Sequence, residues 1–278
     1  FNDSAFGVAV DPNELFAYAE RLSIDVSDRT SDTLQLIDQP ESGYFGCRAS
    51  NDMFIVDCGD IGPSYQPGHT HCDFLSYELM LANQRVIVDT GVCEYEPGPM
   101  RDYVRSTRAH NTVSVDGGEQ SEIWGEFRVA RRARRISASI NKSNNVVTFQ
   151  GAYRGFYGIK DRIEHHRSAT LTLTNFGRNV QSLLIQDEIR GLGNHLVESF
   201  VHLHPDVTVQ YPESGDIALC VNGSLVASIQ VPIDYEYRIE PCIYCPEFGK
   251  RVPSQVLIIR RSGTLPLSLG YEIQRITN

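Results

Sequence analysis

The side chains best suited to chemistry lie close together in residues 68–116. This stretch holds three of the eight histidines, with two carboxylates and a phenol between them: His69, His71, Asp73, Asp89, Tyr95 and His110. Imidazole nitrogen and carboxylate oxygen are donor atoms that zinc and similar divalent ions accept. Imidazole and phenol also move protons in many enzymes near neutral pH. The stretch therefore predicts a metal site, an acid–base site, or both.

The order of these residues resembles the signature of the heparinase II/III-like polysaccharide lyases. HxHxD begins at His69, VDTGxxxY ends at Tyr95, and RSTRAHNTVSVDG begins at Arg105. The resemblance is to the C-terminal β-sheet domain of that family, and it is most specific between His69 and Gly118. It implies an enzyme that cleaves uronic-acid-containing glycans by β-elimination.

The resemblance also implies roles for single residues. His71, Asp89 and His110 would bind a Zn²⁺ ion that is structural in this family and holds the loops under the cleft. Two imidazoles and one carboxylate leave a fourth position for water, which is a normal zinc ligand set. His69 would be the catalytic histidine that the sheet domain contributes. The remaining catalytic residues of the family, an Asn or His and a Tyr, lie in a helical domain.

Three further side chains near the motif are candidates for contact with a glycan. Tyr95 could donate a proton or touch the substrate, or it could be an aromatic residue at the rim; we take it as catalytic. Tyr103 could act in its place and is taken as substrate-binding. Arg105 could bind a carboxylate or sulfate through two hydrogen bonds. The alternative for Arg105 is a salt bridge within the fold. Asn111, next to His110, could hold a loop by side-chain hydrogen bonds.

The composition restricts the classes of partner. The chain has 278 residues, of which 41% are hydrophobic, and its net charge of −10 argues against nucleic acid. An acidic glycan is still possible, because a local basic cleft can override the global charge. No apolar run approaches the roughly 20 residues of a membrane span. Seven cysteines with one lone CxxC, Cys242–Cys245, are expected to be buried or incidental thiols.

Residue periodicity predicts one helix followed by many strands. Asp11 can cap a helix over residues 12–23, with Pro12 at its first position and an apolar stripe that begins at Leu15. Short runs with a period of two follow from about residue 30. These runs are 53–56, 75–81, 86–88, 112–115, 146–149, 170–174, 183–185, 200–203, 217–221, 225–229, 255–259 and 267–273. The pattern predicts an all-β fold, an antiparallel β-sandwich with a short helical segment at the N-terminus.

The runs 75–81 and 86–88 are predicted to form a hairpin that turns at Asn83-Gln84. In that register positions that sum to 167 face each other, so Asp89 lies opposite Glu78. A metal shared by His71 and Asp89 then requires residues 69–74 to bend back, or a β-bulge.

Two other groups of charged residues have simpler interpretations. Residues 128–135 contain five arginines. They could bind a polyanion, but a solvated edge strand whose charges discourage aggregation is the favoured interpretation. His165 and His166 adjoin charged residues and are predicted to lie at the surface.

The resemblance implies two units. Residues 1–28 would be the end of an α/α toroid that is mostly absent, and residues 29–278 the heparinase II/III-like β-sandwich. The expected partners are this toroid and an acidic polysaccharide, with no nucleic acid and no membrane, in the periplasm or outside the cell. The chain alone is expected to fold but to be inactive. Two alternatives are a non-catalytic glycan-binding scaffold that keeps the metal for stability and a hydrolase whose metal activates water.

Overall fold

Antiparallel strands build almost the whole molecule. The computed structural model describes residues 1–8, 10–25, 34–159, 162–174, 178–211 and 215–276. Within them lie two short α-helices, α1 (Pro12–Arg21) and α2 (Pro99–Arg105), and one 3-10 turn (Thr107–Ala109). None of these described helices has the length and apolar character needed to cross a membrane.

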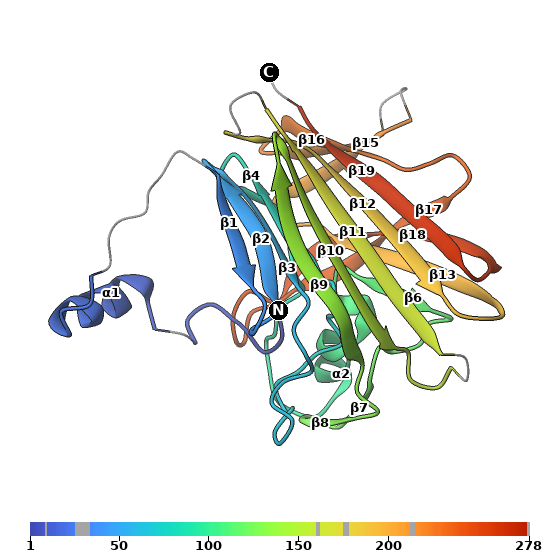
Figure 1. Ribbon diagram of the computed structural model, residues 1–278, viewed down its shortest axis with the longest axis horizontal. Helices are drawn as coiled ribbons and strands as arrows, with labels where there is room; N and C mark the ends of the chain where they lie inside the picture. Colours follow the sequence, from blue (N-terminus) through green and yellow to red (C-terminus); the bar gives the residue numbers. More distant parts are fainter. Residues whose placement is uncertain (9, 26–33, 160–161, 175–177, 212–214, 277–278) are drawn as a thin grey trace.

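One layer of the fold is an eight-stranded sheet, seen as the broad green-to-orange surface in Figure 1. Its order is β14-β15-β16-β19-β12-β11-β10-β9. The strands are β9 (Arg134–Ser143), β10 (Val146–Gly155), β11 (Ile163–Leu173), β12 (Val180–Arg190), β14 (Val207–Gln210), β15 (Ile217–Val221), β16 (Ser224–Gln230) and β19 (Leu267–Arg275).

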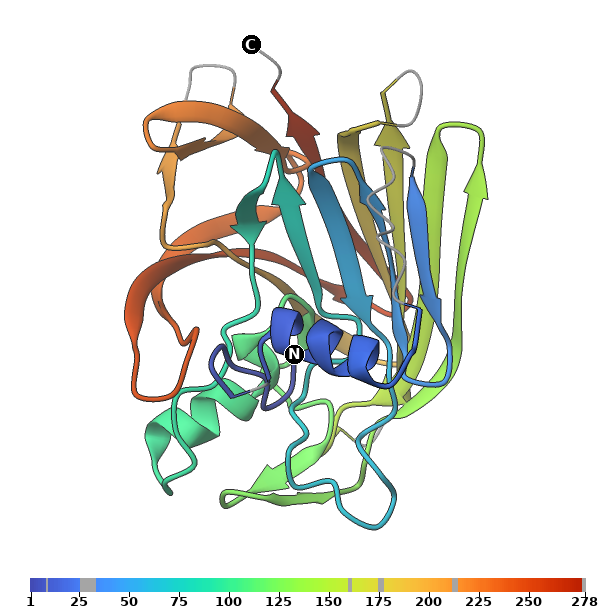
Figure 2. The same cartoon turned by 90° about the vertical axis from the view of Figure 1, so that its left-hand side faces the viewer.

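Two smaller sheets form the other layer, and Figure 2 views it with β1 to β3 in front. The five-stranded sheet runs in order from β1 to β5, and the four-stranded sheet has the order β17-β18-β13-β6. A bridge between Ile87 and Leu203 connects them. The strands are β1 (Gln35–Gln39), β2 (Tyr44–Ala49), β3 (Asp52–Asp57), β4 (Tyr77–Leu81), β5 (Gln84–Ile87), β6 (Val113–Val115), β13 (Asn194–His202), β17 (Glu236–Tyr244) and β18 (Val252–Thr264). β7 (Glu122–Trp124) and β8 (Arg128–Ala130) form a separate hairpin.

The core lies between the layers, because alternate side chains of each strand point inward. In β11 the burial alternates at every residue from Ile163 to Leu173. The rings of Phe45 on β2 and Phe149 on β10 meet across the core with centroids 5.4 Å apart. A buried aromatic or aliphatic side chain of this size contributes roughly 1.5–3 kcal/mol.

The all-β sandwich that the sequence predicts is confirmed. Each of the twelve predicted runs overlaps a strand, and the predicted helix is α1, capped by the Asp11 side chain. Strands β1, β2, β7, β8, β9, β14 and β17 were not predicted. All seven thiols are free, and only Cys242 is not fully buried, as expected.

Helix α1 exposes the apolar stripe that identified it. It has no buried residue, and Leu15, Tyr18 and Leu22 are each more than half exposed. Figure 1 shows α1 standing away from the sheets. The predicted boundary between residues 28 and 29 lies outside the described residues.

The register predicted for the β4–β5 hairpin is wrong. Ala82 and Asn83, not Asn83-Gln84, form the turn, because both have positive φ. Leu81 therefore faces Gln84, and a bulge follows between Leu79 and Met80. The neighbouring β2–β3 turn fixes this geometry: the Asp52 carboxylate accepts from the Ala82 N–H at 2.7 Å, and the Asn51 carbonyl accepts from the Asn83 N–H at 2.7 Å.

The prediction that His165 lies at the surface is also wrong. The alternation along β11 points His165 inward, where it is fully buried and lies 2.7 Å from an oxygen of Asp187. His166 points outward, beside Glu164 at 3.2 Å. The edge-strand interpretation is confirmed for Arg134 and Arg135, which begin β9 at the end of its sheet.

A buried ion pair ties the eight-stranded sheet to the loops beneath it. The Arg167 guanidinium donates from Nε and Nη2 to the two Asp187 oxygens, at 2.6 and 2.8 Å. Its Nη1 donates to the carbonyls of Leu75 and Asn111, at 2.7 and 2.6 Å. Burial would raise the pKa of Asp187, but Arg167 and His165 outweigh burial and lower it.

Replacement of Asp187 should therefore destabilise the fold strongly. Asp187→Asn leaves the buried Arg167 charge without its partner, and we expect a loss of about 3–5 kcal/mol in urea unfolding at pH 7. Because the lowered pKa makes the carboxylate stabilising only while it is ionised, the difference should narrow as the pH falls below about 4. The control is Glu188→Gln on the same strand, in an exposed pair with Arg190, which should cost about 1 kcal/mol or less. Equal losses in the two variants would contradict the assignment.

Candidate active site and metal centre

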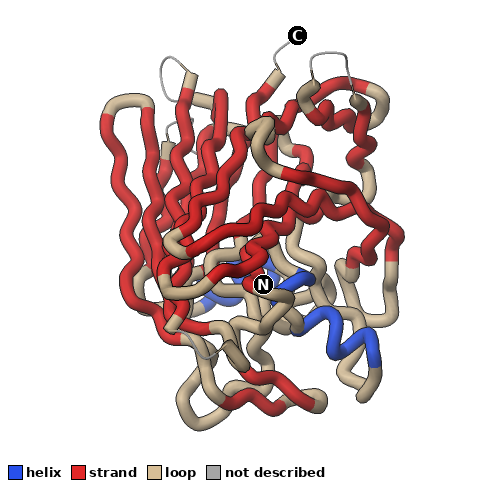
Figure 3. Tube along the Cα trace, turned by 90° about the vertical axis from the view of Figure 1, so that its right-hand side faces the viewer, coloured by secondary structure: helices blue, strands red, loops and turns tan. Residues whose placement is uncertain are grey.

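Three segments that meet at one end of the sandwich build the candidate site. These are the N-terminal residues 1–4, the loop 58–76 after β3, and the connection 88–112 that carries α2; Figure 3 shows loops and helices gathered there. Gly91 fixes part of this connection. Its φ is +77°, a Cβ there would lie 2.1 Å from the Cys245 carbonyl oxygen, and its N–H donates to the Asp89 carboxylate at 2.9 Å.

Two buried histidines and one buried carboxylate form a compact cluster. His71 and His110 are fully buried, and their ring centroids are 5.3 Å apart. Among the described residues, one potential ligand atom from each of His71, Asp73 and His110 lies within 4.8 Å of the others. Two ligands at zinc–nitrogen distance lie at most about 4 Å apart, so small movements would close the cluster around an ion.

Each of these histidines contacts a different carboxylate through one of its ring nitrogens. Asp3 lies 2.8 Å from His71 Nε2, and Asp89 lies 2.7 Å from His110 Nδ1. The opposite nitrogens, His71 Nδ1 and His110 Nε2, are buried and have no hydrogen-bond partner in the described part of the chain. Carboxylates that bind one imidazole nitrogen while the other faces a metal are typical of metal sites. The donor set therefore fits a divalent ion such as zinc.

Burial and these carboxylates shift the pKa values of the groups in the cluster. Burial lowers the pKa of His71, despite its bond to Asp3. Burial also opposes protonation of His110, but Asp89 outweighs it and raises the pKa of that ring. The pKa of Asp89 is lowered because His110 offsets the effect of burial.

The predicted ligands His71, Asp89 and His110 thus lie in one region, but Asp89 does not face the space between the two histidines. His71 and His110 face each other with Asp73 beside them, whereas Asp89 contacts His110 on its far nitrogen. The Asp89 N–H also donates to Glu78 at 3.0 Å, so these two residues do lie together. The ligand set itself stays a prediction.

His69, unlike His71, projects to the surface. Its side chain is 63% exposed, and its Nδ1 lies 3.0 Å from a carboxylate oxygen of Asp3. The ring lies 5.9 Å from the rings of both Tyr95 and Phe127. The structure therefore brings the two predicted catalytic residues, His69 and Tyr95, together. Burial, followed by the charge of Asp3, raises the pKa of Tyr95.

Two residues of this site, Asp3 and Arg101, were missed from the sequence. Both oxygens of Asp3 accept from the buried Arg101 guanidinium while they contact His69 and His71. The Arg101 guanidinium also covers the rings of Tyr95 and Phe127, at 5.0 and 5.4 Å. Burial would raise the pKa of Asp3, but its bonds to His71 and Arg101 lower it. Asp3 lies outside the motifs and outside any periodic segment, so the sequence carries no signal for it.

The side chains of the two predicted substrate-binding residues make contacts within the fold. Arg105 is 1% exposed, and its three nitrogens donate to the carbonyls of Thr70, Gly125 and Arg128. These contacts favour a role within the fold, although they are not the salt bridge named as the alternative. Tyr103 packs against a small apolar cluster that includes Val92.

Asn111 connects β4 and β13 to the start of the connection 88–112, beside the cluster. Its Nδ2 donates to the carbonyls of Tyr77 and Val88, at 2.8 and 2.9 Å, and its Oδ1 accepts from the His202 N–H at 2.6 Å. The expectation that Asn111 holds a loop through its side chain is confirmed. His202 is buried at the same junction, and burial lowers its pKa to about 3.

Residues 32–272 match the family model described as heparinase II/III-like, C-terminal. Curated proteins, in contrast, give no match to this chain.

Solved structures of heparinases share the fold. The structure of heparan sulfate lyase HepC from Pedobacter heparinus matches with a TM-score of 0.74 at 14% identity, covering 100% of this chain and 44% of that one. A heparinase III gene product gives 0.69 at 15%, covering 99% and 43%, and another heparinase III gives 0.66 at 13%, covering 99% and 44%. The present chain thus spans less than half the length of these proteins.

Asn111 should matter for stability independently of any ligand. In Asn111→Ala, two buried carbonyls and the buried His202 N–H lose their partner, and we expect unfolding to be easier by about 3 kcal/mol. Urea denaturation followed by circular dichroism measures this loss. Asn51→Ala, at the exposed β2–β3 turn, is the control and should stay within about 0.5 kcal/mol of the parent. A stable Asn111→Ala protein would rule out the connecting role.

Proposed function

The chain belongs to the heparinase II/III-like family, as its C-terminal domain, and from that membership we propose that it is the β-sandwich part of a polysaccharide lyase. Its reaction would be β-elimination in a uronic-acid-containing glycan. The observation that carries the proposal is the exposed His69 ring, bonded through Nδ1 to Asp3 and next to Tyr95.

His69 is positioned to act as the base. With Nδ1 donating to Asp3, the Nε2 lone pair is free to accept a proton. Removal of the C5 proton of a uronate by Nε2 leaves an electron pair that forms the C4–C5 double bond as the C4–O4 bond breaks. Asp3 acts as a positioning residue, since it fixes the tautomer of His69 and is itself held by Arg101.

Tyr95 is suited to protonate the departing O4. Its raised pKa keeps the phenol protonated, so it can donate and does not compete as a base. The Tyr95 ring lies between the rings of Phe127 and Phe248, with centroids at 5.4 and 4.8 Å, which limits its movement.

We further propose that the buried cluster holds a structural zinc ion. His71 Nδ1, His110 Nε2 and Asp73 would be its ligands, with Asp3 and Asp89 orienting the two rings. The alternative set, predicted from the sequence, has Asp89 in the place of Asp73. Such an ion supplies cross-linking of the segments around the site. Full burial of both histidines argues against a hydrolase that activates water on this metal, because a substrate could not reach it.

Part of the catalytic machinery is proposed to lie outside this chain. The solved heparinases extend over more than twice its length. We therefore assign the groups that neutralise the substrate carboxylate to a further domain of a longer protein, and expect this chain alone to be inactive. The substrate class is an acidic, uronate-bearing polysaccharide.

The zinc proposal predicts about one zinc per chain after dialysis, measured by elemental analysis. His71→Ala and His110→Ala should lose the ion, whereas His204→Ala, at a histidine outside the cluster, should keep it. Chelator competition with Asp73→Asn and Asp89→Asn then identifies the third ligand. Loss of an orienting carboxylate weakens metal binding about 10–100-fold, and loss of a ligand should weaken it more. A well-folded parent without metal would refute the site.

The lyase proposal is tested on the longer protein with a panel of uronate polymers. Formation of the unsaturated uronate is followed by its ultraviolet absorbance. His69→Ala should lower the rate by about 10²–10⁴-fold, the contribution typical of a proton-transfer group. His204→Ala is the matched control and should retain the parent rate. Full activity in His69→Ala would remove the assigned base, and binding without elimination in the parent would favour a non-catalytic glycan-binding scaffold.

A further inference from the structure

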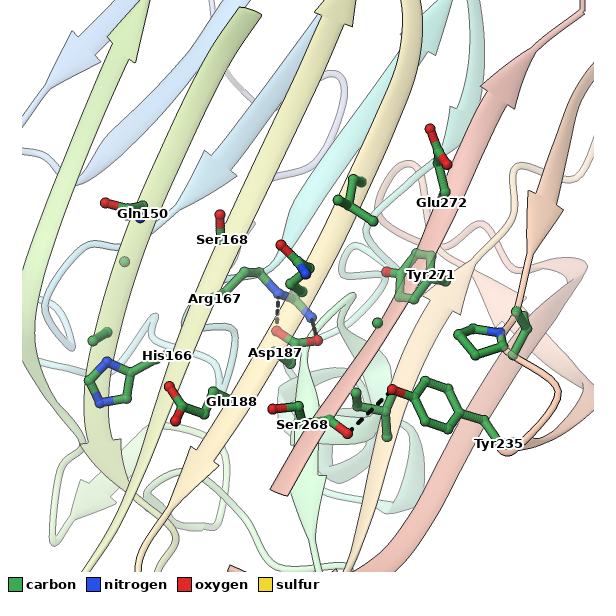
Figure 4. A pocket seen from close by; sticks show the side chains of 18 of the residues that line it. Gln150, His166, Arg167, Ser168, Asp187, Glu188, Tyr235, Ser268, Tyr271 and Glu272 are labelled. Carbon is green, nitrogen blue, oxygen red and sulfur yellow. Dashed lines mark hydrogen bonds and ion pairs between the residues drawn. The ribbon is translucent and has the colours of Figure 1, made fainter. Parts of the chain in front are cut away.

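A large hollow in the described part of the molecule lies outside the candidate active site. It is a groove of about 990 Å³ on the outer face of the eight-stranded sheet (Figure 4). Strands β10, β11, β12 and β19 form its floor, and the segment after β16 forms one wall. The candidate-site residues His69, Tyr95, His71 and His110 do not line it.

The floor of the groove is low in the middle and polar at the sides. Gln150, Ser168, Gln186 and Gly270 face one another on four neighbouring strands. Strands about 4.8 Å apart place the two glutamines roughly 10 Å from each other, with the small Ser168 side chain between them. Gly270 keeps the floor low beyond Gln186, since a Cβ there would lie 2.8 Å from the Ile185 carbonyl oxygen.

An aromatic side chain closes one end of the groove. Tyr235, in the segment that follows β16, donates its hydroxyl to the Ser268 carbonyl at 3.5 Å. The Arg261 guanidinium lies 5.2 Å from the centre of the Tyr235 ring. Figure 4 shows Tyr235 reaching toward Ser268 across this end. A ring held in this way is a rigid apolar surface next to polar groups.

Three side chains on the floor of the groove carry uncharged hydrogen-bonding groups. Gln150 and Gln186 are exposed, and neither their amides nor the Ser168 hydroxyl bond to any other described residue. An amide side chain offers two donors and a carbonyl acceptor, so a pair of them can bind hydroxyl groups in either direction. This arrangement matches a ligand rich in hydroxyls.

The charges of the groove exclude a polyanion. Glu188 is paired with Arg190 at 2.6 Å, and Asp216 accepts from Gln230 at 3.2 Å. Glu272 has no partner among the described residues, so acidic groups outnumber basic ones along the walls. The buried Arg167–Asp187 pair below the floor is neutral as a unit. A uronate polymer would be repelled here.

We propose that this groove is a second carbohydrate site that binds an uncharged oligosaccharide. One sugar ring lies over Ser168 between Gln150 and Gln186, and a neighbouring ring packs against Tyr235. The site is separate from the proposed lyase site in position and in ligand charge, and it does not depend on the lyase assignment.

Calorimetric titration of the 278-residue chain with neutral and acidic tetrasaccharides tests the proposal. The neutral probes are cellotetraose, maltotetraose and tetra-N-acetylchitotetraose, and the acidic probe is tetragalacturonate. We expect at least one neutral probe to bind with a Kd of about 1 mM or lower. The double variant Gln150→Ala/Gln186→Ala should weaken that binding about tenfold or more, because two hydrogen-bonding side chains are lost. Ser168→Leu, which fills the floor, should weaken it as well.

Gln255→Ala, an exposed glutamine on β18 of the other layer, and His69→Ala should bind as the parent does. Shifts of the Gln150 and Gln186 side-chain amide signals in nuclear magnetic resonance spectra should accompany binding. The proposal is overturned if no neutral probe binds at about 10 mM, if the glutamine double variant binds normally, or if tetragalacturonate binds more tightly than every neutral probe. Loss of binding in His69→Ala would move the ligand to the other site and also overturn it.

Discussion

The buried Arg167 guanidinium holds together the eight-stranded sheet and the loops that carry the candidate site. It leaves β11 toward the core, pairs with Asp187, and binds the backbone carbonyls of Leu75 and Asn111. A charge in the interior is tolerated only when it is paired and its donors are used. These contacts therefore fix the loop beside His110 relative to the eight-stranded sheet.

The same requirement explains why the candidate site draws on segments that are distant in sequence. A buried imidazole needs at least one hydrogen-bond partner, and a buried carboxylate needs donors. Asp3 answers this need for His71, and Asp89 does so for His110. Because Asp3 also contacts His69 and Arg101, the exposed ring and the buried cluster share one anchor. A change in the buried cluster would thus be felt at the surface histidine.

The sequence predicts what depends on local pattern and fails where distant contacts decide. Strand positions follow from the alternation of residues, and the order of the motifs locates His69, His71 and His110. Both the alternation and the motifs are patterns of residues that are close together in the sequence. The prediction of the β4–β5 register fails because the Asp52 carboxylate, from another turn, accepts a hydrogen bond from the Ala82 N–H and so fixes the position of the hairpin turn. Asp3 has no local feature that reveals its role.

His165 shows the same limit from another side. Its charged neighbours in the sequence suggest that it lies at the surface. The alternation of side chains along β11 instead places it in the core, beside Asp187. The strand period of two sends His165 and Arg167 inward and His166 and Ser168 outward. One strand thereby supports the loops of the candidate active site with one face and forms the floor of the neutral groove with the other. Because each side chain contributes to only one face, outward substitutions can change the groove while the buried contacts that hold His110 stay in place.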